Sequence, residues 1–159
     1  MEFERPEWLD QMAGILETLN EGVLIVDDCD HVIFVNACFE EMTGVSREEI
    51  LGRDPLLIYY GPEDAAFIHE RRREVRALGR VRHEFFLPTK DGTRLPVISS
   101  ARNLEDPDGR TFTIISFTDI SEQKSAEEQL RAANKLLEDR QKEIEEEEHR
   151  QRILANIKL

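Results

Sequence analysis

Residues 32–53 read VIFVNACFEEMTGVSREEILGR, and this stretch decides the fold. Apolar residues up to Val35 predict a β-strand, and Asn36 follows at once, where its amide can cap a helix over ACFEEMT. Gly44 then stands where a glycine ends a helix. The next residues, SREE, form a capping-box pattern that predicts a second short helix. The stretch therefore predicts a strand that leads directly into two short helices.

The flanking segments complete an α+β pattern. Residues 22–27 read as a short buried strand that can pair with residues 31–35 as a hairpin, and residues 62–78 read as a helix that ends at Gly79. Three further strands are predicted at residues 82–87, 94–102 and 111–118. Asp-Gly turns join these three strands, and such turns are a strong signal of antiparallel hairpins. This order of elements predicts one sheet with helices over one face.

The composition allows one ordinary domain and argues against nucleic-acid binding. The chain has 159 residues, of which 40% are hydrophobic and 35% charged, and its net charge is -13. A nucleic-acid-binding surface needs concentrated basic residues. The basic cluster of this sequence consists of Arg71, Arg72, Arg73, Arg76, Arg80 and Arg82. We expect these arginines to form a solvated helix face or to pair with nearby acids.

The cysteines and the N-terminal sequence favour a cytoplasmic location. Cys29 and Cys38 have neither metal-ligand nor redox-motif spacing, so we expect no metal site and no disulfide scaffold. No window approaches the roughly 18 apolar residues of a membrane span, and the acidic N-terminus does not read as a signal peptide. We therefore expect no membrane partner.

The two ends of the chain read as helices outside the sheet-forming segment. Residues 1–20 contain an amphipathic helix, residues 21–120 form the globular domain, and residues 121–159 read as one long charged helix without Gly or Pro. Alternate spacings of four and three residues place a set of apolar side chains on one face of the long helix. This set, which we call the seam, comprises Leu130, Ala133, Leu137, Ile144 and Leu154.

The long helix needs a partner. Its length of roughly 58 Å has little to pack against within the same chain. A second copy is the simplest partner, so we expect a homodimer through the N-terminal helix and a coiled coil of the long helix. Arg140, Glu147 and Gln151 interrupt the seam, so parallel and antiparallel pairing both stay open.

Three motifs in this order, VIFVNACFEEMTGVSREEILGR, KDGTRLPV and FTDISEQKSAEEQL, resemble the PAS family of sensor domains. The match covers about residues 14–122, and Asn36, Phe39 and the Asp91-Gly92-Thr93 turn fall where the family places them. The resemblance implies an α+β fold with a five-stranded antiparallel sheet in the order 2-1-5-4-3. It also implies helices on one sheet face, a cavity between sheet and helices, and a C-terminal coiled-coil helix that carries the signal onward.

Asp119, Ile120 and Ser121 stand where PAS sensors carry Asp-Ile-Thr, at the junction of the last strand and the output helix. The resemblance implies that these residues relay movement of the sheet to the helix. A direct junction passes small displacements on, whereas a flexible linker would absorb them. We expect Asp119 to accept hydrogen bonds from the first helical amides; the alternative is an ordinary helix cap without a signalling role.

A PAS cavity would be lined by the helices and the inner face of the sheet. The candidates for its lining are Phe39, Met42, Ile58, Phe67, Phe85, Ile98 and Ile114. Each is equally an ordinary core residue. A filled core and a cavity for a small-molecule ligand therefore both stay open.

Two cofactors of PAS sensors find little support in the sequence. Light-sensing relatives carry a reactive cysteine for flavin in the region that corresponds to residues 52–58, which contains none here. Haem-binding relatives place an axial histidine on the long helix of the domain, where this chain has His69. Counting back from Gly79 puts Ile68 at the ligand position instead, and neighbouring helical residues point about 100° apart. We expect neither a flavin–cysteine adduct nor haem.

The sequence carries no glycine-rich phosphate loop, no GxSxG motif and no HExxH motif. We therefore expect a sensory module rather than an enzyme, with an output domain such as a histidine kinase, a diguanylate cyclase or a phosphatase outside these residues. Two alternatives stay open. One is a structural dimerisation platform without a ligand, and the other is a histidine-kinase fragment with His149 as the phosphoacceptor.

Overall fold

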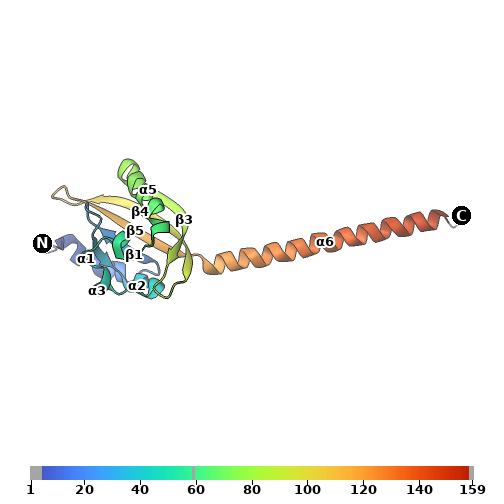
Figure 1. Cartoon of the computed structure of the whole chain (residues 1–159), viewed down its shortest axis with the longest axis horizontal. Coiled ribbons are helices and arrows are strands. Elements are labelled where there is room, and N and C mark those ends of the chain that lie inside the picture. The colour runs from blue at the N-terminus through green and yellow to red at the C-terminus, as the bar shows by residue number, and fades with distance from the viewer. Residues whose placement is uncertain (1–4, 59, 158–159) are drawn as a thin grey trace. The chain divides into compact units, whose positions relative to one another are not determined.

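The computed structural model describes residues 5–58 and 60–157, and for Ile58 it describes the backbone alone. The elements follow one another as two strands, a set of helices, three strands and a long helix (Figure 1). They are α1 (Glu7–Glu17), β1 (Gly22–Val26), β2 (Val32–Val35), α2 (Ala37–Thr43), α3 (Arg47–Ile50), α4 (Pro55–Ile58), α5 (Pro62–Leu78), β3 (Arg80–Pro88), β4 (Arg94–Glu105), β5 (Thr111–Asp119) and α6 (Ser121–Ile157).

The five strands form one antiparallel sheet in the order β2-β1-β5-β4-β3, which confirms the expected topology. β5 lies at the centre of this sheet. It pairs with β1 on one side, where Ile115 faces Leu24, and with β4 on the other, where Ile115 faces Ala101. The last strand in sequence is therefore held by hydrogen bonds along both of its edges.

β1 is buried on both faces, which explains its uninterrupted apolar sequence. Leu24 and Val26 belong to one hydrophobic cluster, whereas Val23 and Ile25 belong to another. Successive side chains of a strand point to opposite faces, so the two clusters lie on the two sides of the sheet. The sheet is thus the middle layer of the domain.

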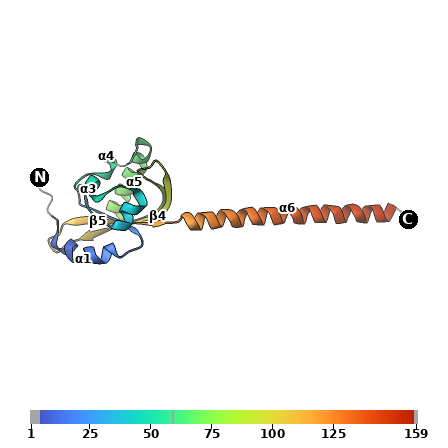
Figure 2. The same cartoon turned by 90° about the horizontal axis from the view of Figure 1, so that it is seen from below.

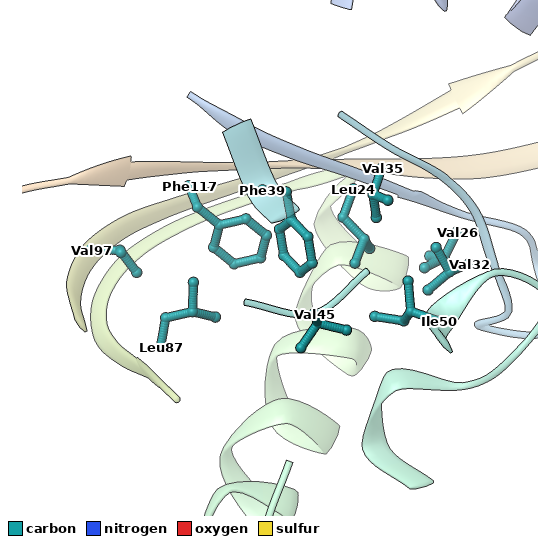
Figure 3. Close-up of a cluster of buried hydrophobic side chains, with 10 residues drawn as sticks. All are labelled: Leu24, Val26, Val32, Val35, Phe39, Val45, Ile50, Leu87, Val97 and Phe117. Atoms are coloured by element: carbon teal, nitrogen blue, oxygen red, sulfur yellow. The ribbon is translucent and has the colours of Figure 1, made fainter. Parts of the chain in front are cut away.

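The first cluster fills the space between the sheet and α2 and α3 (Figure 3). Phe39 is 1% exposed, and its ring lies 5.6 Å from that of Phe117 on β5. Leu87 and Val97 bring the other half of the sheet into the same cluster. Helices α2 to α5 therefore cover one face, as expected.

The second cluster lies beneath α1, on the opposite side of the sheet from α3 and α5 (Figure 2). Leu9 and Leu16 of α1 are buried there. The rings of Trp8 and Phe112 pack edge to face, with centroids 5.3 Å apart. The N-terminal helix thus covers the face that the other helices leave open. Two further apolar side chains of α1, Met12 and Ile15, are exposed.

Asn36 joins three elements through one fully buried amide. Its Oδ1 accepts hydrogen bonds from Phe39 N–H at 2.9 Å, the predicted helix cap, and from Val23 N–H at 2.8 Å. Its Nδ2 donates to the carbonyls of Leu16 and Glu21, at 3.0 and 2.9 Å. α1, β1 and α2 are therefore fixed relative to one another by a single side chain.

α6 forms a second unit, because residues 1–120 and 121–159 separate into two compact bodies. α6 contains 37 residues in one unbroken helix, and none of residues 121–157 is buried. Its length is about 55 Å at the standard helical rise. Within residues 5–58 and 60–157, no helix has both the length and the apolar content that crossing a bilayer requires.

Replacing Asn36 with alanine should destabilise the domain strongly. The substitution removes the acceptor of the buried Val23 and Phe39 N–H groups, and we expect a loss of about 3 kcal/mol or more in the free energy of unfolding. Urea unfolding followed by circular dichroism measures this loss. Asn134→Ala on the exposed surface of α6 is the control and should change stability by less than about 0.5 kcal/mol. Equal stability of the two variants would contradict the central role of the Asn36 amide.

Candidate functional site

A cavity of about 80 Å³ lies between α5 and the face of the sheet that carries the first cluster. Alternate residues of four strands line it, together with one side of α5. From the sheet come Leu24, Val26, Val81, His83, Phe85, Ser99, Ala101, Thr113, Ile115 and Phe117. β3 and β5 contribute three of these side chains each, so the central strand forms part of the cavity floor.

Of the candidates whose side chains the structure describes, Phe85 alone lines this cavity. Ile114 packs on the other sheet face with the cluster beneath α1. Ile98 pairs with Thr118 across β4 and β5 and directly precedes Ser99, which lines the cavity. The expectation that Ile98 and Ile114 face the cavity is therefore corrected, because strand alternation turns both away from it.

The remaining candidates lie around the cavity rather than on its surface. Phe39 belongs to the buried core, and Met42 packs against that core. Phe67 stacks on Phe85, with ring centroids 5.6 Å apart and an interplanar angle of 22°. The side chain of Ile58 lies outside the described residues. The aromatic residues therefore support the wall that Phe85 presents to the cavity.

Charged side chains gather on the α5 side of the cavity. Arg72 forms a two-pronged ion pair with Asp54, with nitrogen–oxygen distances of 2.5 and 3.1 Å. Arg76 donates to Asp30 at 2.5 Å. Burial would raise the pKa of Asp54, but hydrogen bonds from Arg72 and from Leu56 N–H outweigh it and lower that pKa. Asp30 has a φ of 65°, an uncommon left-handed conformation for a residue other than glycine.

Two nitrogen atoms in the cavity wall are buried and unsatisfied among the described residues: Arg71 Nε and His83 Nδ1. The Arg71 guanidinium lies 5.3 Å from the Phe67 ring centroid, and the His83 ring lies 4.9 Å from the same centroid. Burial, followed by the positive charge of Arg71, lowers the pKa of His83 to about 4. His83 is therefore neutral at pH 7. Each unsatisfied buried nitrogen costs roughly 1–3 kcal/mol.

Three residues separate the cavity from a groove on the surface. Asp30, Arg72 and Arg76 line both the cavity and the groove, whereas His69 and Arg73 line the groove. His69 is exposed, and the neighbouring Ile68 lines the cavity instead. Arg72 and Arg76, for which the sequence predicts a solvated helix face or pairing with nearby acids, thus pair with Asp54 and Asp30 and lie at the mouth of the cavity. The signal that could have revealed them is their spacing, since residues 72 and 76 lie one helical turn apart.

Neither cysteine lies among the described residues that line the cavity. Cys29 is exposed in the β1–β2 turn, and Cys38 is half-buried on α2. The volume is also far below the roughly 300–1,000 Å³ of pockets that hold drug-sized molecules. These residues do not fit a flavin–cysteine adduct.

The β1–β2 turn brings together three side chains of the types that bind metal ions, which the spacing of the cysteines did not predict. Donor atoms of Asp27, Cys29 and His31 all lie within 4.8 Å of one another. Asp27 Oδ1 accepts the backbone N–H groups of Cys29 and His31, which shapes the turn. The sequence signal for this group is the spacing of Asp27, Cys29 and His31, which occupy every second position.

The predicted relay residues lie at the boundary between the two units. Asp119 is the last residue of β5 and Ser121 the first of α6. Ile120 between them is 4% exposed, and its N–H donates to the Pro96 carbonyl at 3.0 Å. The seam residues of α6 are all exposed, among them Leu130, Leu137, Ile144 and Leu154.

An antiparallel sheet of this order, with helices enclosing a cavity on one face, defines a class of α+β domains. A family model described as PAS domain matches residues 20–122. The chain therefore belongs to the PAS domain family.

Solved structures support this fold assignment. The PAS domain of a protein from Colwellia psychrerythraea is 19% identical, covers 73% of this chain and 99% of its own, and has a TM-score of 0.62. A PAS domain from a two-component sensor histidine kinase is 21% identical, covers 71% of this chain and 97% of its own, and has a TM-score of 0.56. A fungal LOV domain photoreceptor is 23% identical, covers 63% of this chain and 73% of its own, and has a TM-score of 0.53.

The neutral, half-buried state of His83 predicts a pH dependence of stability. The folded pKa of about 4 lies below the roughly 6.5 of an unfolded chain, so the unfolded state binds this proton first as the pH falls. The contribution of His83 to the free energy of unfolding is therefore fully present above about pH 6.5 and is lost as the pH falls toward 4. Urea midpoints at pH 7, 6, 5 and 4.5 should fall more steeply for the natural chain than for His83→Phe. Parallel curves would show that His83 does not titrate as its burial requires.

Proposed function

We propose that this chain is a cytoplasmic, non-catalytic PAS sensory module that dimerises and relays a signal from its cavity to an output domain through α6. The observation that carries this proposal is the connection between β5 and α6. Only Ile120 separates the strand from the helix. Because Ile120 is buried and its N–H is bonded to Pro96, the connection has no flexible loop that could absorb a displacement.

The same strand forms the cavity floor and continues into the connection. Thr113, Ile115 and Phe117 line the cavity, and Ile120 follows three residues after Phe117. A ligand that binds one arrangement of these side chains better than another shifts the population of β5 conformations. The relay that we propose passes this shift through Asp119, Ile120 and Ser121 into the position or rotation of α6.

Dimerisation is supported by the exposed apolar side chains of α6. Leu130 and Leu137 are 63% and 64% exposed, although leucine favours burial, and Ile144 and Leu154 are more than half exposed as well. A second copy of the helix would cover this seam in a coiled coil. Exposed Met12 and Ile15 on α1 offer a further apolar contact for the same dimer.

The output of such a module lies in a partner domain. A histidine kinase, a diguanylate cyclase or a phosphatase can each respond to a change in a helix that enters it. A ligand-free dimerisation platform is the second candidate, and the small volume of the cavity, about 80 Å³, favours it. The two candidates share the dimer and differ in whether occupancy of the cavity alters α6.

Substitution of one seam residue should dissociate the dimer, whereas substitution of its neighbour should not. Leu137 lies on the seam and Leu136 does not, yet their exposures are 64% and 69%. A charge at position 137 would be buried in the coiled coil, so Leu137→Glu should raise the dimer dissociation constant by about tenfold or more. Sedimentation equilibrium of the natural chain, Leu137→Glu and Leu136→Glu measures this difference. A monomeric natural chain at tens of micromolar, or equal effects of both substitutions, would contradict the proposed seam.

A further inference from the structure

The cavity has two chemically distinct sides. Its charged lining residues come from α5 and the β1–β2 turn: Arg71, Arg72, Arg76 and Asp30. The sheet side presents small and apolar side chains together with His83, which is neutral at pH 7. Nearby carboxylates pair with these arginines, but three of the four charged lining residues carry guanidinium groups, whose N–H groups can only donate. A molecule that fits this arrangement therefore has one end that accepts hydrogen bonds and one apolar end.

The arginines retain donors for an additional anion. A guanidinium carries five N–H donors. Arg76 is half-exposed and uses its Nη2 on Asp30, and no other described residue pairs with it. Arg71 pairs through its terminal nitrogens with Glu70 and Glu74, while its Nε is unsatisfied. Carboxylates and phosphates are the acceptors that such planar donor groups bind through two parallel hydrogen bonds, and the carboxylate is the smaller of the two.

The volume limits the apolar end. A cavity of about 80 Å³ holds more than one water molecule, but it is about half of the roughly 150 Å³ that accommodates benzene. It therefore suits a tail of about three to five carbon atoms. Ala101 and Ser99 leave this space because their side chains are small.

We propose that the cavity binds a short-chain monocarboxylate, with the carboxylate on the arginines of α5 and the apolar tail against β4 and β5. This ligand class rests on the proposed sensory function and specifies what the module senses. The head group lies at the mouth that Arg72 and Arg76 form with Asp30, and the tail reaches Ile115 and Phe117. Arg71 and His83 supply further donors once the Arg71 side chain moves from its place over Phe67.

Butyrate, butyramide and 1-butanol are matched probes for this proposal. They share the tail and differ in the head group, and the ¹⁵N-labelled chain of 159 residues can be titrated with each by NMR. We expect saturable shifts of the amides of Ser99, Ala101, Thr113 and Ile115 with butyrate, and binding weaker by about tenfold or more with the two neutral probes. Equal affinity for butyrate and butyramide would overturn the proposal, as would the absence of saturable binding of butyrate.

Two substitutions locate the head group. Arg76 lines the cavity and the surface groove, whereas Arg73 lines the groove without reaching the cavity. Arg76→Gln should weaken butyrate binding by about tenfold, whereas Arg73→Gln should leave it unchanged. Similar effects of both would show that butyrate binds in the groove, and this too would overturn the proposal. Ala101→Leu fills the cavity and should abolish binding; urea unfolding of all three variants confirms that they are folded.

The amides of α6 distinguish this inference from the proposed sensory function. If butyramide binds better than butyrate and also shifts α6 resonances, the ligand class is wrong and the relay stands. If butyrate binds as expected but α6 resonances do not respond, the ligand class stands and the relay is wrong.

Discussion

The position of β5 at the centre of the sheet is the constraint on which the rest of the structure depends. β5 is hydrogen-bonded along both edges, to β1 and β4. One of its faces forms the cavity floor, and Phe112 and Ile114 on the other pack beneath α1. A side chain placed in the cavity therefore cannot displace β5 without disturbing two strands and a helix. Ile120, which follows β5, is buried as well and donates its N–H to the Pro96 carbonyl.

Much of the fold could be predicted because its signals are local. Asn36 capping Phe39 N–H, Gly44 ending α2 with a φ of 72°, and the Asp-Gly turns all act within a few residues. The bonds from Asn36 to Leu16 and Glu21 were not predictable, because they join residues 20 and 15 positions apart that only the folded chain brings together. For the same reason the sequence predicted that an amphipathic α1 exists but not which sheet face it covers.

The cavity was harder to predict than the core, and the reason is steric. A search for large apolar side chains finds residues that fill space, such as Phe39, whereas a cavity forms where small residues leave it empty. Ser99 and Ala101 line the cavity, whereas the larger Ile98, which precedes Ser99 on β4, faces away. The arginines at the mouth were visible as a charge run, but their approach to Asp30 and Asp54 required the β1–β2 turn and α4 to be placed first.

Coupling between the cavity and α6 is the central claim, and pulsed electron paramagnetic resonance tests it most directly. A spin label at Lys142→Cys, with Cys29 and Cys38 replaced by serine, reports the distance between the α6 helices of a dimer. We predict that filling the cavity with Ala101→Leu changes this distance distribution, and that a Gly-Ser-Gly-Ser insertion between Ile120 and Ser121 removes the change. Identical distributions for open and filled cavities, or a change that survives the insertion, would contradict the claim.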